Sequence, residues 1–167
     1  MSAATGFWNQ PSTPYRNFQI VFTVLTLNFA VPAFVYTFTP TMAVESILQV
    51  NQLMGGGTYP FDETSSELWR ILAAANVAVL AFMCLLLQLD LRKWYAVLAP
   101  LCFLKAYAAL GLAGIYLLHT DVPFFLAGTL LDGVTLAVIY TFSTRAHADI
   151  VARPVEELVP RPRWAGP

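Results

Sequence analysis

The sequence has 167 residues, of which 57% are apolar and only 11% are charged, and its net charge is −1 at pH 7. Because soluble domains are usually about 25% charged, this composition excludes a soluble globular protein with an ordinary polar surface. The near-zero net charge and the thin spread of basic residues also argue against nucleic-acid binding.

Apolar stretches long enough to cross the ~30 Å hydrocarbon core of a bilayer recur along the chain. We expect a single domain, residues 1–167, with four transmembrane spans at about residues 17–38, 66–89, 94–118 and 122–143. Such spans must be helical, because lipid offers no hydrogen-bond partner to the backbone. Tryptophan and tyrosine residues cluster near the span ends, as is typical of membrane interfaces. The predicted fold is therefore an all-α membrane protein, an antiparallel four-transmembrane-helix bundle.

The loop at residues 39–65, between the first two spans, is expected to contain a short helix. Thr39-Pro40 suits a helix N-cap and a first-turn proline, so the first span should end there and a new helix should begin. The segment Met42 to Met54 has amphipathic spacing, and Gly55-Gly56-Gly57 would stop this helix and act as a hinge. We expect the helix to lie along the outer membrane surface, or else to pack its apolar face on a partner subunit.

The distribution of basic residues predicts an orientation. The outer loop 39–65 contains no Lys or Arg, whereas the loop between the second and third spans contains Arg92 and Lys93. The proline-rich C-terminal tail, residues 144–167, is expected to be extended and carries further arginines: Arg145, Arg153, Arg161 and Arg163. By the positive-inside rule, both termini are expected in the cytoplasm.

Two charged residues fall near the middle of predicted spans, where a charge costs about 2.5 to 3.5 kcal/mol on insertion scales. Lys105 lies in the third span and Asp132 in the fourth, and the short connection His119-Thr120-Asp121 makes these spans antiparallel neighbours. An ion pair between them is therefore expected. It would serve as a helix-pairing device, or as a proton relay or headgroup site. We favour the structural role, because a relay needs more titratable groups than this depth contains.

Asn28 in the first span and Asn76 in the second give each remaining helix one strongly polar side chain. Together with Lys105 and Asp132 they form the candidate intramembrane polar cluster, which is either structural or ligand-binding. Hydrogen bonds between helices are sufficient to explain the two asparagines, since such bonds contribute roughly 0.6 to 2 kcal/mol.

The sequence offers no ligand set for metal, haem or redox chemistry. The histidines, His119 and His147, lie on opposite sides of the predicted membrane and cannot ligate haem as a pair. Cys84 and Cys102 are expected to be buried thiols, although their similar depth leaves a disulfide open. We predict no catalytic residue, no metal site and no cofactor. A bound lipid or pigment remains compatible with the sequence.

Several residues between Leu68 and Tyr140 carry a family resemblance. Leu89-Asp90 ends the second span, Pro100 and Lys105 lie in the third, and Leu131-Asp132-Gly133 lies in the fourth. This segment resembles small uncharacterised bacterial four-helix integral membrane proteins. The resemblance implies a multi-pass protein of the bacterial inner membrane and brings no known activity with it.

Three functions fit these observations. The first, which we favour, is an accessory non-catalytic integral membrane subunit of a larger membrane protein complex, for example an energy-transducing (respiratory or photosynthetic) one. The second is a stand-alone binder or transporter of a small or lipidic molecule through the midplane cluster of Lys105, Asp132 and the two asparagines. A polar cavity there would favour it, and a dry, closed pair would count against it. The third is a membrane enzyme acting on lipid or quinone, for which the available surface residues are Glu67, Arg70, His119 and Asp121.

Overall fold

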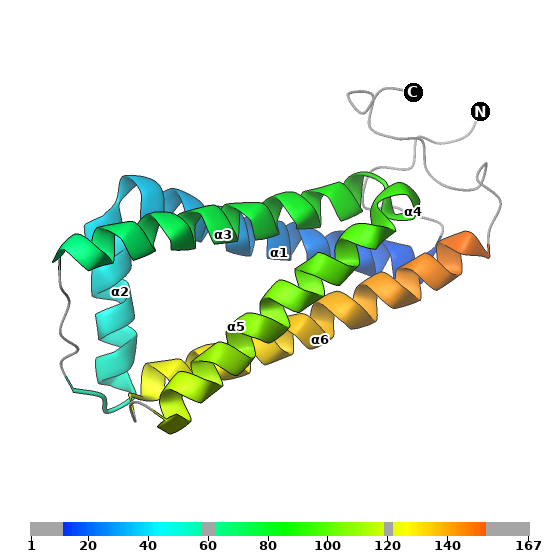
Figure 1. Ribbon diagram of the computed structural model, residues 1–167. Helices are drawn as coiled ribbons and strands as arrows, with labels where there is room; N and C mark the ends of the chain where they lie inside the picture. The colour runs from blue at the N-terminus through cyan, green and yellow to red at the C-terminus, as the bar shows by residue number, and fades with distance from the viewer. Residues whose placement is uncertain (1–11, 58–62, 119–121, 153–167) are drawn as a thin grey trace.

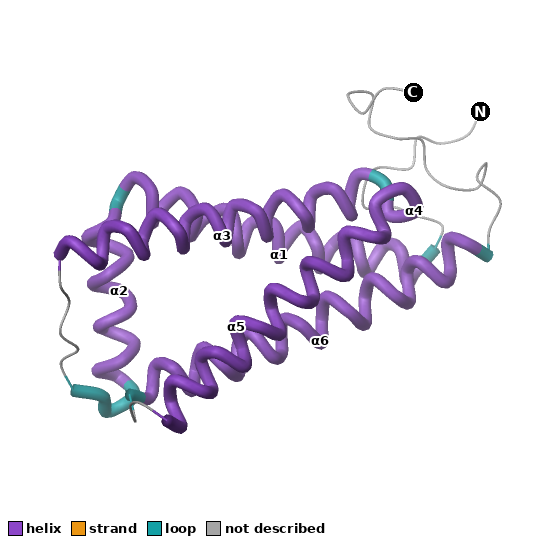
Figure 2. Tube along the Cα trace, viewed as in Figure 1, coloured by secondary structure: helices purple, strands orange, loops and turns teal. Residues whose placement is uncertain are grey.

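The structure is a computed structural model of the chain, and it describes residues 12–57, 63–118 and 122–152. Every regular element in these ranges is a helix, which confirms the all-α prediction for them (Figures 1 and 2). In chain order the elements are α1 (Thr13–Phe38), α2 (Pro40–Leu53), α3 (Glu63–Leu89), α4 (Leu91–Trp94), the 3₁₀ helix η1 (Tyr95–Val97), α5 (Leu98–Leu118) and α6 (Pro123–Val151).

Four helical segments are long and apolar enough to cross a membrane, as predicted: Thr13–Phe38, Trp69–Leu89, Leu91–Leu118 and Pro123–Val151. The fourth helix extends beyond the predicted boundary, so residues 144–151 belong to α6 and not to the tail. The prediction failed there because falling hydropathy marks the border of an apolar stretch, whereas a helix continues until a residue stops it. The first proline after this region is Pro154.

The chain breaks between α1 and α2 at the predicted position. The Thr39 backbone N–H donates to the Val35 carbonyl at 2.9 Å and completes α1. Pro40 then occupies the first position of α2, where its missing N–H costs no hydrogen bond. As a result α2 lies crosswise to the long helices and extends from the end of α1 toward α6 (Figure 1).

The glycine run after α2 forms a hydrogen-bonded helix C-cap, a more fixed structure than the predicted hinge. Gly55 adopts a positive φ of 81°, and the Gly56 N–H donates to the Asn51 carbonyl at 2.9 Å. The buried Asn51 side chain donates through Nδ2 to the Gly57 carbonyl at 2.8 Å. A Cβ on Gly56 would lie 2.6 Å from Cγ of Asn51, so only glycine fits without a shift.

Short helical turns join α3 to α5. Asp90 caps α4, because its side chain accepts the Lys93 backbone N–H at 3.0 Å. Pro100 has no N–H to offer the Ala96 carbonyl, and the chain tightens into the 3₁₀ turn η1 just before it. The third long segment is therefore the nearly continuous helix Leu91–Leu118.

The long helices form two pairs. α1 packs along α3, α5 packs along α6, and α1 also contacts α6, whereas α3 makes few contacts with α5. Figure 1 shows that the helices of each pair run in opposite directions and that the pairs diverge from the end near α4 toward the end near α2. We call these ends the α4 end and the α2 end. The sequence predicted an antiparallel four-helix bundle, and the structure has two antiparallel pairs that lie apart at the α2 end.

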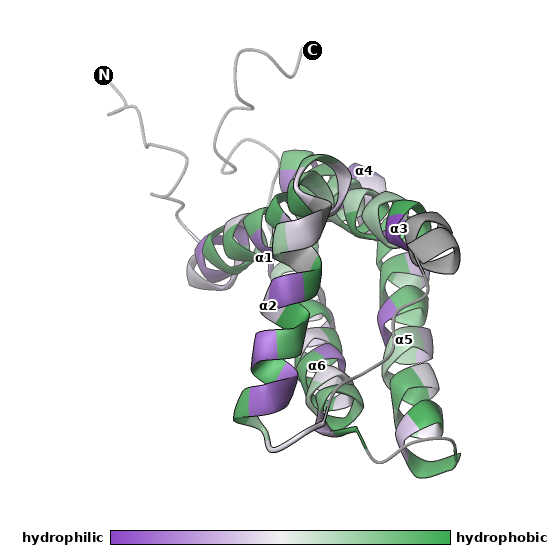
Figure 3. Cartoon of the chain, turned by 90° about the vertical axis from the view of Figure 1, so that its left-hand side faces the viewer, coloured by the Kyte–Doolittle hydropathy of each residue, from purple (hydrophilic) through white to green (hydrophobic). Residues whose placement is uncertain are grey.

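The buried core lies toward the α4 end. It is built from α1 up to Phe29, the second half of α3, α4, the start of α5 and the second half of α6: Phe18, Phe22, Leu25, Phe29, Leu80, Cys84, Leu87, Leu91, Leu98, Leu101, Ile139, Ala146 and Ile150. Toward the α2 end the same helices expose large apolar side chains, and Leu117, for example, is 76% exposed. Hydrophobic residues predominate along the long helices (Figure 3). Such extensive apolar surface requires lipid or protein around it.

Candidate functional site

Lys105 of α5 and Asp132 of α6 form a salt bridge, which the antiparallel packing of these two helices brings about. The Lys105 side chain is 8% exposed and that of Asp132 is 15% exposed. An ammonium and a carboxylate that are shielded to this degree and bonded directly neutralise each other, which removes most of the cost of burying either charge.

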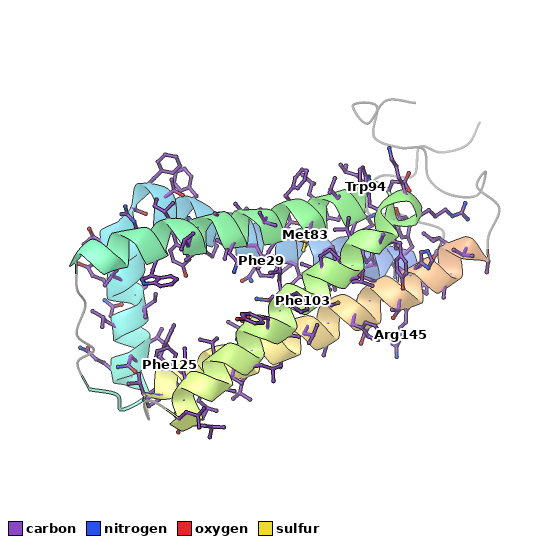
Figure 4. All side chains as sticks on the ribbon, viewed as in Figure 1. Phe29, Met83, Trp94, Phe103, Phe125 and Arg145 are labelled. Atoms are coloured by element: carbon purple, nitrogen blue, oxygen red, sulfur yellow. The ribbon has the colours of Figure 1, made fainter. Side chains whose placement is uncertain are left out.

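The Lys105 ammonium also contacts a third long helix, α1. Its Nζ lies 4.9 Å from the ring centroid of Phe29 on α1, a cation–π contact. Figure 4 shows Phe29 between the two helix pairs. Lys105 of α5 is therefore a point at which α1, α5 and α6 converge.

This convergence also marks the limit of the buried core. The buried residues of α1 end at Phe29 and those of α5 end at Lys105, while those of α6 begin at Thr135. Beyond this level, toward the α2 end, the helix pairs diverge. The ion pair thus closes the core on the side of the opening between the pairs.

The two asparagines of the predicted cluster lie apart from the ion pair. Asn28 and Asn76 are both exposed, and neither side chain has a hydrogen-bond partner among the described residues. Asn28 directly precedes Phe29, but successive side chains on a helix point about 100° apart, so it faces elsewhere. The structure brings together Lys105 and Asp132 and leaves Asn28 and Asn76 outside, and these four side chains do not form a joint polar site.

A second polar contact, between α1 and α3, was not anticipated from the sequence. Gln19 donates through Nε2 to the Gln88 carbonyl at 3.0 Å, and Gln88 donates through Nε2 to the Thr26 hydroxyl at 3.2 Å. Both glutamines are buried. Both glutamines lie near the ends of predicted spans, where a long polar side chain is expected to reach the headgroups. Their contact could have been predicted from the antiparallel pairing of the first and second spans, which places Gln19 and Gln88 near each other.

Further contacts tie α6 to the start of α1 and to α4. Ser12 bonds to Asp149 through its hydroxyl, and an Arg92 guanidinium N–H donates to the Ile150 carbonyl. The rings of Tyr95 and His147 stack with centroids 3.6 Å apart and planes 12° apart. The residues from α6 were assigned to an extended tail by the sequence, so these contacts could not be predicted. They hold the end of α6 against the start of α1 and the α4–η1 turn at the α4 end of the molecule.

The described residues contain no other candidate chemistry. They include no group of three or more His, Cys, Asp or Glu side chains that could hold a metal ion. Cys84 and Cys102 are free thiols, so the disulfide that the sequence left open is not formed. His119 and Asp121, which the enzyme hypothesis needs, lie outside the described residues, as does the side chain of Glu67.

Comparisons with known proteins found no relative. The chain matches no protein-family model, no curated protein and no solved structure. The resemblance to small bacterial four-helix membrane proteins therefore remains a prediction.

Proposed function

We propose that this chain is a multi-pass protein of the bacterial inner membrane that serves as a non-catalytic accessory subunit of a larger membrane protein complex. The four apolar helical segments cross the bilayer as antiparallel neighbours. Both termini lie in the cytoplasm with the α4 end, and α2 lies at the outer surface. The positions of Arg92, Lys93 and Arg145 toward the α4 end support this orientation through the positive-inside rule.

The closed Lys105–Asp132 pair is the observation that carries the non-catalytic role. A midplane binding or transport site must offer its polar groups to a ligand. Here the two charges bond to each other, the ring of Phe29 lies against the ammonium, and both asparagines point elsewhere. The charged groups thus join helices together, and neither charge is presented to a substrate.

The open packing toward the α2 end supports a role as a subunit. There, α3 and α5 diverge and leave large apolar side chains exposed, including Trp69, Leu110 and Leu131. Helices of other membrane proteins would find close-packing surfaces on these faces. An energy-transducing complex, respiratory or photosynthetic, is the partner class that we propose to test first.

The decisive experiment is purification of the tagged chain from native membranes in a mild detergent, followed by native electrophoresis and mass spectrometry. We expect it to migrate with a complex of other proteins, far above its own 18.4 kDa. A matched variant with both Lys105→Met and Asp132→Leu should migrate in the same complex, because the pair only joins helices. Migration of the chain alone, or only with copies of itself, would contradict the subunit role.

The binder or transporter is the remaining alternative, and the same preparation tests it. A lipid or small molecule that co-purifies in stoichiometric amounts with the native chain, and is lost from the double variant of Lys105 and Asp132, would favour that alternative. Retention of the same lipids by both proteins would support the structural role of the pair.

A further inference from the structure

Exposed side chains on the apolar helices, among them Asn28 on α1, Asn76 on α3 and Tyr107 on α5, carry hydrogen-bonding groups without a partner among the described residues. Of these, Asn28 and Tyr107 lie on helices that run in the same direction, and Tyr107 is 71% exposed. Neither forms a hydrogen bond to any other described residue. In hydrocarbon an unsatisfied amide or hydroxyl is costly, and tyrosine prefers the membrane interface. A hydrogen-bond partner from outside the chain would therefore stabilise both groups.

The two side chains lie at nearly the same depth. The contact between Phe29 and the Lys105 ammonium shows which residues of α1 and α5 lie at the same position along the helix axes. Asn28 precedes Phe29 by one residue and Tyr107 follows Lys105 by two, and both helices run from the α4 end to the α2 end (Figure 1). At 1.5 Å per residue the two positions differ by about 5 Å along the helix axes, which a tyrosine side chain spans.

Both side chains point away from the helix that pairs with their own. Thr26 accepts a hydrogen bond from α3, and Asn28 follows it by two residues, about 200° around α1. Lys105 bonds to α6, and Tyr107 follows it by the same interval around α5. Figure 3 shows α1 and α5 on opposite sides of the molecule. The two polar groups therefore face outward in different directions.

Each polar residue belongs to a largely exposed apolar seam, in which only Val35 of α1 and Gly114 of α5 are half-buried, and the two seams have the same spacing. The α1 seam is Val24, Asn28, Val31, Val35 and Phe38, and the α5 seam is Phe103, Tyr107, Leu110, Gly114 and Leu117. Steps of four and three residues alternate in both, which is the spacing of helices that pack at a small left-handed crossing angle. The polar residue occupies the second position of each seam, and Gly114 would lie opposite Val35.

We propose that copies of this chain associate in the membrane by packing the α1 seam of one copy against the α5 seam of the next, with the helices parallel. The Tyr107 hydroxyl then donates to Oδ1 of Asn28 in the neighbouring copy. A second copy is the occupant because the two seams match in spacing, direction, depth and polar position. Since the seams lie on opposite sides of the molecule, the contact repeats head to tail and builds a ring or a row.

Disulfide cross-linking between two differently tagged copies tests this contact in membranes. One copy carries Asn28→Cys and the other carries Tyr107→Cys, and a disulfide needs Cα atoms within about 7 Å. We expect an oxidised dimer that contains both tags. The native chain, with Cys84 and Cys102, gives the background. Two copies that both carry Asn28→Cys should form no more dimer than this background.

A mismatched pair from the same seams controls for random collision. Val24→Cys and Leu117→Cys lie on the two seams but differ in depth by about 20 Å in the proposed register. They should give no dimer above background, and a yield equal to that of the matched pair would overturn the proposal. The double variant Asn28→Cys and Tyr107→Cys within one chain should produce a ladder of multimers. An intramolecular disulfide would overturn it too.

Removing the polar contact provides an independent measurement. Asn28→Leu should weaken self-association about 3- to 20-fold, as measured by energy transfer between labelled copies in vesicles. An unchanged association would contradict the inference.

The inference does not depend on the proposed role as a subunit of a larger complex. Absent cross-links with intact co-purification would refute only the self-contact, whereas multimers of the chain without other proteins would refute only the subunit role.

Discussion

Removing one charge of the Lys105–Asp132 pair is expected to destabilise the protein strongly. Either Lys105→Met or Asp132→Leu leaves the other charge in a site where its side chain is at most 15% exposed. Breaking a buried pair in this way costs about 3 to 5 kcal/mol. The lysine variant also loses the contact with Phe29, which contributes about 0.5 to 2 kcal/mol.

The double variant should recover most of that loss. Methionine and leucine fill similar volumes without charge, and such replacements of buried pairs are often neutral or stabilising. Unfolding by SDS in mixed micelles, followed by tryptophan fluorescence, gives the free energies for a double-mutant cycle. We expect a coupling energy of about 3 kcal/mol. The exposed Lys93→Met is the matched control and should cost less than about 1 kcal/mol.

Two results would refute this reasoning. Single variants within about 0.5 kcal/mol of the native chain would mean that the charges are hydrated and not packed against each other. A double variant as unstable as the worse single variant would mean that the charged groups have another role, such as holding a ligand. The second result would revive the binder or transporter alternative.

Two glycine pairs give further predictions with built-in controls. In Gly56→Ala the new methyl group should clash with the buried Asn51 side chain, which should destabilise the protein by about 1 to 3 kcal/mol and speed amide hydrogen exchange in α2. A Cβ at Gly57 would have no neighbour within 4 Å, so amide exchange in Gly57→Ala should match that of the native chain. Gly128→Val should destabilise the protein by about 1 to 3 kcal/mol in the SDS assay, because even a Cβ would lie 2.9 Å from a side chain of α5. Gly133→Val, at an open position, should cost much less. Equal effects within either pair would contradict the packing described.

The long helices were predictable because length and hydropathy are strong local signals. The break at Thr39 was also predictable, since proline and threonine act through their own backbone and capping chemistry. The end of α6 was not, because polar residues after the apolar stretch continue the helix where nothing stops it. A helix boundary and a membrane boundary are different physical events.

The arrangement of the helices was harder to predict than their existence. Every face of these helices is rich in apolar residues, so hydropathy does not say which faces meet. The sequence therefore suggested an antiparallel bundle and a single cluster that included Asn28 and Asn76. The structure instead has diverging pairs. The charges could be anticipated because each has one obvious neutralising partner, whereas an asparagine can bond to many groups, including those of another copy.

Membrane topology is the property on which all the functional proposals depend, and thiol labelling in intact cells measures it most directly. Gly57→Cys at the α2 end and Ala152→Cys at the α4 end are exposed positions, and the native chain controls for Cys84 and Cys102. We predict that an impermeant maleimide labels Gly57→Cys in intact cells and Ala152→Cys only after permeabilisation. Labelling of both positions from the same side, or release of the protein from membranes by alkaline carbonate, would contradict the four-span arrangement.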